Sequence, residues 1–251
     1  MMSERAVGTV PDLRTRLMGA AVWSTDVAKG LTASPGDLRH LGPWLRAMRA
    51  SPLDGAVPWW PYSVVEEVGA MLGPSSRVFE YGSGGSTLWL EPRVGYLRSI
   101  EHDRNWYEQV ARRTATGAVT LIEATSTGTI STRVETGFFD DYVSSIESEA
   151  PASLDLVIVD GRCRVACVEA ARTRVRPGGV LLLDDSSRGR YAGVADLLDG
   201  WSRRDAHGLK PGGAAHSTLW TAPQQATGAE EVIPEGASSS VDRAAEPMDG
   251  P

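Results

Sequence analysis

A glycine-rich segment between acidic residues is the part of this 251-residue sequence best suited to chemistry. The run Glu80-Tyr-Gly-Ser-Gly-Gly-Ser-Thr87 follows a short apolar stretch that predicts a strand. Glycines between a strand and a helix let backbone amides approach a ligand that a Cβ atom would hold away. A second acid, Glu101, comes nineteen residues after Gly82, where a carboxylate can accept hydrogen bonds from ribose hydroxyls. The pattern favours a nucleoside-binding turn over a plain tight turn.

The spacing of these glycines argues against several common cofactors. A dinucleotide-binding loop prefers Gly-x-Gly-x-x-Gly, but Thr87 holds the third glycine position. The Gly-Lys-Ser/Thr of a phosphate-binding loop is absent from the sequence, as is the Tyr-x-x-x-Lys of short-chain dehydrogenases; the lysines are Lys29 and Lys210. Acids at 80 and 101 instead complement a cofactor with a sulfonium, an ammonium and a ribose, as in S-adenosylmethionine.

Three segments resemble the class I S-adenosylmethionine-dependent methyltransferases, and bacterial small-molecule enzymes most of all. They are Val78-Phe-Glu-Tyr-Gly-Ser-Gly-Gly-Ser-Thr, Ser99-Ile-Glu-His-Asp and Val157-Ile-Val-Asp-Gly-Arg, within a resemblance that spans 60–221. The family's usual third glycine is Ser86 here. The resemblance implies that Glu101 holds the ribose and His102 lies near the adenine, although a solvent-facing or core histidine is the alternative. The other implied cofactor-binding residues are Glu80, Gly82, Ser83, Gly84 and Asp160.

Three acids are expected to converge at one edge of the predicted sheet. Asp160 ends the fourth strand, and Asp184 and Asp185 end the fifth. Carboxyl ends of neighbouring parallel strands face one crevice, and three oxygen ligands suit Mg²⁺. The set resembles metal-dependent O-methyltransferases, which implies a metal on Asp160, Asp184 and Asp185 that lowers the pKa of the acceptor hydroxyl. Those enzymes carry a lysine where this chain has Cys163. The alternative is that Asp184 and Asp185 cap a turn, with Asp160 acting alone as base or substrate contact.

Arginines follow the same two strands. Arg162 and Arg164 come after the fourth strand, and Arg188 and Arg190 after the fifth. Guanidinium groups bind carboxylate, phosphate or sulfate through paired hydrogen bonds, so Arg162 and Arg188 are candidates for binding an anionic acceptor. Charge balance for the neighbouring acids is the alternative interpretation.

Aromatic residues and one histidine complete the candidate site. Trp59, Trp60 and Tyr62 precede the first strand, where aromatic walls can cover an acceptor pocket or pack the core of the protein. His216 precedes the last strand and titrates near neutrality, so it is a candidate general base beside Asp160.

The alternation of short apolar runs with helical stretches predicts the fold class. We expect an α/β fold, with a doubly wound, mostly parallel, seven-stranded Rossmann-like methyltransferase sheet behind an N-terminal helical cap. The expected domains are the cap at 1–60, the methyltransferase domain at 61–221 and a disordered tail at 222–251. Strands are expected at 77–81, 97–101, 119–123, 155–160, 179–184, 203–207 and 217–221, and helices at 11–29, 36–50, 62–72, 86–91, 104–114, 164–174 and 190–202.

Composition limits the partners. The sequence has a formal net charge of −7, which disfavours a large nucleic-acid footprint. It has no run of 18 apolar residues and no convincing secretory signal, so a cytoplasmic protein that does not insert in membranes is expected. Its oligomeric state stays open.

Together these patterns predict a methyltransferase that uses S-adenosyl-L-methionine, with Mg²⁺ as a conditional second cofactor. The acceptor is expected to be a small molecule, and the three acids favour oxygen over nitrogen. The alternatives are an N-methyltransferase and a non-catalytic S-adenosylmethionine-binding scaffold with the same fold.

Overall fold

The computed structural model describes residues 25, 27–32, 34–47 and 51–224 of the chain. Its centre is a seven-stranded sheet in the order β3-β2-β1-β4-β5-β7-β6, in which the first five strands run parallel and β7 runs antiparallel to both of its neighbours. The strands are β1 (Arg77–Tyr81), β2 (Tyr96–Glu101), β3 (Val119–Leu121), β4 (Leu154–Val159), β5 (Val175–Asp184), β6 (Ser202–Lys210) and β7 (Gly213–Thr221).

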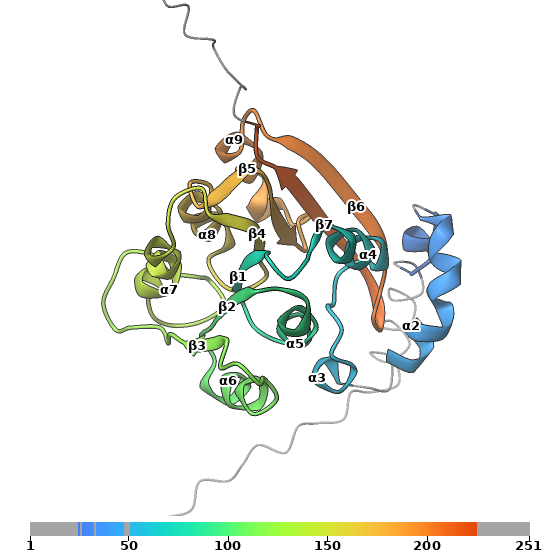
Figure 1. Ribbon diagram of the computed structural model, residues 1–251, viewed down its shortest axis with the longest axis horizontal. Helices are drawn as coiled ribbons and strands as arrows, with labels where there is room; N and C mark the ends of the chain where they lie inside the picture. The colour runs from blue at the N-terminus through green and yellow to red at the C-terminus, as the bar shows by residue number, and fades with distance from the viewer. Residues whose placement is uncertain (1–24, 26, 33, 48–50, 225–251) are drawn as a thin grey trace, which may run out of the picture.

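Helices cover both faces of this sheet (Figure 1). In the described part of the chain, none of them is long and apolar enough to cross a membrane. One face carries α4 (Tyr62–Met71) and α5 (Gly85–Leu90), with α6 (Arg104–Ala111) beside α5. The other carries α7 (Asp140–Ser144), α8 (Arg164–Ala171) and α9 (Val194–Leu197). The remaining helices are α2 (Leu41–Ala47), α3 (Pro52–Gly55) and the 3₁₀ turns η1 (Pro35–His40), η2 (Glu91–Arg93), η3 (Ser145–Ser148) and η4 (Gly189–Tyr191).

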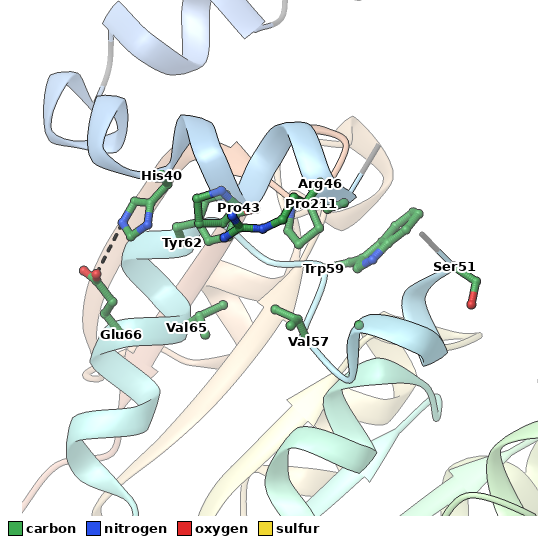
Figure 2. Close-up of a pocket in the computed structure, with 12 residues that line it drawn as sticks. His40, Pro43, Arg46, Ser51, Val57, Trp59, Tyr62, Val65, Glu66 and Pro211 are labelled. Carbon is green, nitrogen blue, oxygen red and sulfur yellow. Dashed lines mark ion pairs between the residues drawn. The ribbon is translucent and has the colours of Figure 1, made fainter. Parts of the chain in front are cut away.

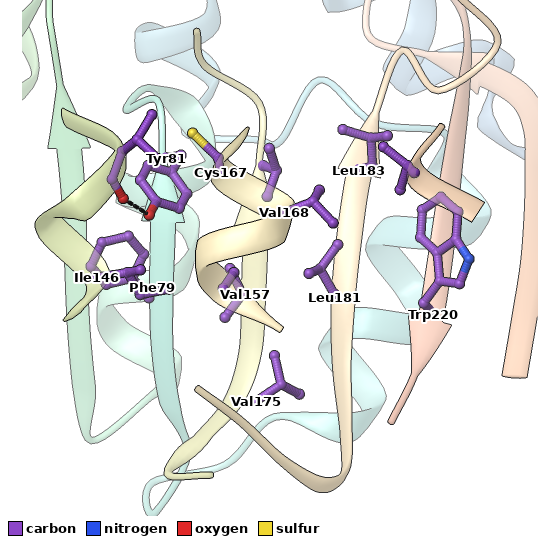
Figure 3. Packing of buried hydrophobic residues seen from close by; sticks show 14 of the residues in the cluster. Phe79, Tyr81, Ile146, Val157, Cys167, Val168, Val175, Leu181, Leu183 and Trp220 are labelled. Carbon is purple, nitrogen blue, oxygen red and sulfur yellow. Dashed lines mark hydrogen bonds between the residues drawn. The ribbon is translucent and has the colours of Figure 1, made fainter. Parts of the chain in front are cut away.

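The central strands are apolar on both faces because helices cover both sides. Leu156 and Ile158 of β4 pack toward α4 and α5, whereas Val157 and Val159 pack toward α7 and α8. Figure 3 shows the second of these layers, in which Val157 lies among side chains of β1, β5 and α8. This two-sided burial holds the carboxyl end of β4, where the candidate residues follow.

The predicted fold class is confirmed, and all seven strands form near their expected positions. Asp103 caps α6 as its sequence position suggests, since its side chain accepts a hydrogen bond from the Trp106 amide at 2.8 Å. One expectation was wrong. The helix expected at 190–202 is instead the short turn η4 followed by the four-residue α9, because Gly193 interrupts the helical stretch and Gly200, at φ +80°, follows soon after α9.

The N-terminal cap docks on the hairpin formed by β6 and β7. Asp37 of η1 is almost fully buried, and its carboxylate accepts a hydrogen bond of 2.7 Å from the Leu209 amide. Trp44 of α2 donates its indole N–H to the Gly213 carbonyl at 3.1 Å. Most of the helix expected at 11–29 lies outside the described residues, as do positions 48–50 and the tail from 225 onward. Ala222, at the start of the predicted tail, is buried and pairs with Gly179.

Replacing Asp37 with alanine tests this docking contact. We expect Asp37→Ala to lower the free energy of unfolding by about 1–3 kcal/mol, because the buried Leu209 amide would lose its acceptor. Urea unfolding measures the change, with Asp199→Ala as the control at an exposed aspartate. Equal stability of the two variants would contradict a structural role for the contact.

Candidate functional site

The glycine loop binds the end of β1 to the end of β4. The Gly82 amide donates to the Ile100 carbonyl at 2.8 Å, and the Asp160 amide donates to the Tyr81 carbonyl at 2.9 Å. Gly82 has φ +91°, and a Cβ atom there would lie 3.0 Å from backbone atoms of Asp160 and Gly161. Only glycine satisfies both the conformation and the close approach. The loop therefore lies between β1 and β4, where a doubly wound sheet forms its ligand crevice.

The buried residue Glu80 holds the glycine loop in place through hydrogen bonds. Its side chain is fully buried, and its carboxylate accepts hydrogen bonds from the hydroxyls of Ser86, Thr87 and Ser99, the last two at 2.6 Å. Burial raises the pKa of Glu80 to about 7, although the three hydroxyls oppose the shift. These bonds join β1, the first turn of α5 and β2. The contact of Glu80 with the cofactor stays a prediction.

Glu101 ends β2 beside the same loop. One carboxylate oxygen accepts from the Ser83 amide at 3.0 Å and the Ser83 hydroxyl at 2.9 Å. The other accepts from the amides of His102 and Asp103 at 2.8 and 3.0 Å. Burial alone would raise the pKa of Glu101, but His102 and these amides lower it below its usual value. Glu101 is therefore a fixed anion at the crevice.

A chain of charges runs from Glu101 toward the arginines. The His102 ring lies between two acids, 2.9 Å from Glu101 and 3.1 Å from Glu135. Glu135 also accepts hydrogen bonds from Arg162. Burial would lower the pKa of His102, but the two carboxylates raise it above its usual value. The His102 ring is largely buried and also lies near the core aromatics Phe139 and Tyr142, at 5.9 and 6.0 Å between ring centres. Its proximity to adenine stays a prediction.

The three acids expected to hold Mg²⁺ each have another partner. Asp160 pairs with Arg164 at 2.8 Å, Asp185 pairs with Arg188, and Asp184 accepts from the Ser217 hydroxyl at 2.7 Å. Across the described residues, no three His, Cys, Asp or Glu side chains are grouped as metal ligands. The donors present do not fit a metal ion, and we derive no step through one.

We call Asp160, Asp184 and Asp185 the acid cluster, and two of its members have raised pKa values. Burial raises the pKa of both Asp160 and Asp184, and the charge of Asp185 raises them further. Asp185 has φ +50°, a strained conformation for a residue with a side chain, at the end of β5. The carboxyl groups of Asp160 and Asp184 therefore hold a proton more readily than that of an exposed aspartate does.

Lys210 is a residue that the sequence reasoning did not select. Its charge opposes the raised pKa values of Asp160 and Asp184, and its Nζ lies 5.9 Å from the centre of the Trp59 ring. The Pro211-Gly212 turn joins β6 to β7 directly after it, with Gly212 at φ +72°. The scarcity of lysine was the only signal in the sequence that could have marked this residue.

His216 lies on the other side of the sheet from Asp184. Its ring stacks on His207 of β6, with ring centres 3.9 Å apart. Side chains alternate along a strand, so Ser217 beside it points to the opposite face and binds Asp184. The structure does not join His216 to Asp160, and its role as a base stays a prediction.

The candidate substrate residues line two separate cavities. Arg162 and Arg188 line one of about 800 Å³, which we call the arginine cavity. It also contains Gly161 and Cys163, together with Arg133, Arg164 and Arg190. Trp59 and Tyr62 line the other, about 430 Å³ in volume (Figure 2), which we call the cap cavity. Trp60 lines neither, because it is fully buried between α4 and the sheet.

The fold and the site together define a class. The strand order, the antiparallel β7 inserted between β5 and β6, and the acid-glycine loop after β1 give this chain the class I methyltransferase fold expected from its sequence.

Several of the solved structures that resemble this chain are methyltransferases. A methyltransferase-like protein from Silicibacter pomeroyi is 25% identical over 66% of this chain and 91% of its own, with a TM-score of 0.44. An O-methyltransferase from Bacillus cereus in complex with SAH is 16% identical over 86% of this chain and 93% of its own, at 0.46. An rRNA methylase from Streptococcus thermophilus is 12% identical over 65% of this chain and 97% of its own, with a TM-score of 0.49. No protein-family model matches the chain, and no curated protein matches its sequence. The description of the fold rests on the chain's own strand order and loop.

The buried state of Glu80 predicts a pH dependence of stability. Its pKa is about 7 in the folded protein and near 4.5 when unfolded, so the unfolded chain releases the proton first as the pH rises. The stability contribution is complete below pH 4.5 and is lost as the pH rises toward about 7. We expect wild type to lose about 1–3 kcal/mol relative to Glu80→Gln across this window. Urea unfolding at several pH values measures the difference.

Glu91 supplies a control of opposite sign. Burial would raise its pKa, but hydrogen bonds from Thr116 and Ala115 lower it below 4.5. Relative to Glu91→Gln, wild type should therefore gain stability as the pH rises through the acidic range. The same trend for both variants would contradict the assignment to Glu80.

Proposed function

We propose that this chain is an S-adenosylmethionine-dependent methyltransferase that acts on a small anionic acceptor, with a hydroxyl as the favoured nucleophile. The observation that carries the proposal is the position of the glycine loop. Gly82 packs directly against Asp160 and Gly161, and Gly161 lines the arginine cavity. A cofactor on the loop and an acceptor in the cavity would thus be neighbours at one edge of the sheet.

The loop fits S-adenosylmethionine in its shape and its donors. The close approach at Gly82 keeps the backbone free of side chains at the crevice. Three backbone amides fix Glu101, but the Ser83 hydroxyl can rotate away and leave its place to a ribose hydroxyl. Ser83, Gly84 and Glu101 would hold the cofactor, which supplies a sulfonium methyl group for transfer to a nucleophile.

The acid pair supplies the proton acceptor in this proposal. A hydroxyl acceptor must lose its proton as the new bond to the methyl group forms. Asp160 is about a quarter exposed at its side chain (29%), whereas Asp184 is buried behind it. Asp160 can therefore receive the proton; burial and the charge of Asp185 raise its pKa, whereas Arg164 and Lys210 lower it.

The arginine cavity supports an anionic acceptor. Five of its lining residues are arginines, against a single lining carboxylate, Glu169. Asp160, Asp185 and Glu135 already pair with three of the arginines. Within the described part of the chain, Arg133 and Arg190 have no carboxylate partner. A carboxylate, phosphate or sulfate on the acceptor would complete their charge balance.

Calorimetric titration with S-adenosylhomocysteine tests the cofactor. We expect micromolar binding by wild type and a loss of at least tenfold in Glu101→Ala, because the carboxylate that accepts from the ribose would be gone. Glu108→Ala, at an exposed glutamate paired with Arg112, is the matched control and should bind like wild type. Absence of binding to wild type would remove the basis of the methyltransferase proposal.

The acceptor class is tested by methyl transfer to phenolic acids and sugar phosphates beside their neutral esters and parent sugars. Wild type should prefer the anionic member of each pair. Arg190→Met should raise KM for that member by about tenfold with a smaller change in kcat, since the guanidinium contributes binding rather than proton transfer. Arg112→Met serves as the control. An equal rate for charged and neutral acceptors would contradict the anion preference.

A further inference from the structure

The cap cavity is separate from the candidate methyl-transfer site. It lies between α2, α4 and the tip of the β6–β7 hairpin (Figure 2). Its lining contains no residue of the glycine loop, the acid cluster or the arginine cavity. The lining residues are His40, Pro43, Arg46, Ala47, Ser51, Gly55, Val57, Trp59, Tyr62, Val65, Glu66 and Pro211.

Its walls are flat and apolar. His40 stacks on Tyr62 with ring centres 4.6 Å apart and ring planes 17° from parallel. Trp59 faces the cavity from the other side, and Figure 2 shows Val57 and Val65 between the two walls. Trp59 keeps 40% of its surface exposed, although it is one of the largest apolar side chains in the protein. A cavity of about 430 Å³ with such walls is in the size range of small-molecule sites.

One positive charge in the cavity has no partner among the described residues. The Glu66 carboxylate pairs with Arg39, and the His40 ring lies 3.3 Å from it. Arg46, by contrast, has no hydrogen-bond or ion-pair partner among the residues that the structure describes. Burial raises the pKa of the Tyr62 hydroxyl, whereas the charge of Arg46 lowers it. Asp37, whose charge also raises the pKa of Tyr62, accepts a hydrogen bond from the Leu209 amide.

We propose that the cap cavity is a binding site for a flat, apolar monocarboxylate. Its rings would lie between Trp59 and the stacked pair of His40 and Tyr62, and its carboxylate would bind Arg46. The apolar walls match the rings of such a ligand, and the exposed Arg46 at the same cavity supplies a guanidinium that can bind its carboxylate. The proposal concerns a site beyond the methyl-transfer centre and does not depend on the reaction there.

Calorimetric titration with 1-naphthoate tests the site, with 1-naphthalenemethanol as the neutral probe of the same shape. Wild type should bind 1-naphthoate at least tenfold more tightly than the alcohol. Arg46→Met should remove this preference while binding of the alcohol is unchanged, and Trp59→Ala should weaken both probes. Arg112→Met, on the distant α6, should behave like wild type.

Three outcomes would overturn the proposal. They are no binding of 1-naphthoate to wild type, equal affinity of wild type and Arg46→Met, and displacement of the probe by saturating S-adenosylhomocysteine. The last would place the probe in the crevice of the glycine loop instead.

Near-ultraviolet circular dichroism verifies that each variant is folded. Arg46→Lys, which keeps the charge, should retain part of the preference for 1-naphthoate. Because the readout is binding of the probe, failure of methyl transfer leaves this test intact.

Discussion

The buried carboxyl of Glu80 is the interaction on which the rest of the site depends. Hydroxyls of Ser86, Thr87 and Ser99 converge on it, so one side chain joins β1 to the start of α5 and to β2. A carboxyl without water is costly to ionise, and the hydroxyls compensate for part of that cost. These hydrogen bonds fix the start of α5, and with it the loop that follows β1, relative to β1 and β2.

Beyond Glu80, the candidate functional residues lie in three separate regions of the structure. The acids Asp160 and Asp184 follow the central strands, the arginine cavity extends beyond them toward α8, and the cap cavity lies on the side of α4. Glu135 connects Glu101 at the glycine loop with the arginine cavity, because it contacts both His102 beside Glu101 and Arg162 in that cavity. Such a connection places the expected ribose acid and the expected acceptor arginines in one electrostatic network.

Short sequence patterns correctly predicted the elements that depend mainly on neighbouring residues in the chain. The apolar runs of β1, β4 and β5 are found where the sequence predicts them, and the helix cap at Asp103 follows from its residue type and spacing. The helix expected at 190–202 failed because two glycines outweighed an apolar periodicity. The metal site is not supported because a side chain's partner depends on its surroundings: Asp185 pairs with Arg188, and Asp184 with Ser217 of β7, thirty-three residues away.

The sequence by itself determined the class of fold and the position of the glycine loop, since strand periodicity and a glycine-rich turn after an apolar strand are properties of short segments. The tertiary structure alone decided which candidates meet. It separated Trp59 and Tyr62 from Arg162 and Arg188 into two cavities, buried Trp60, and turned His216 to the far side of the sheet from Asp184. It also brought Lys210 close enough to Asp160 for their charges to interact. Those outcomes depend on how distant strands pair and which face each side chain takes, and no spacing within a segment encodes them.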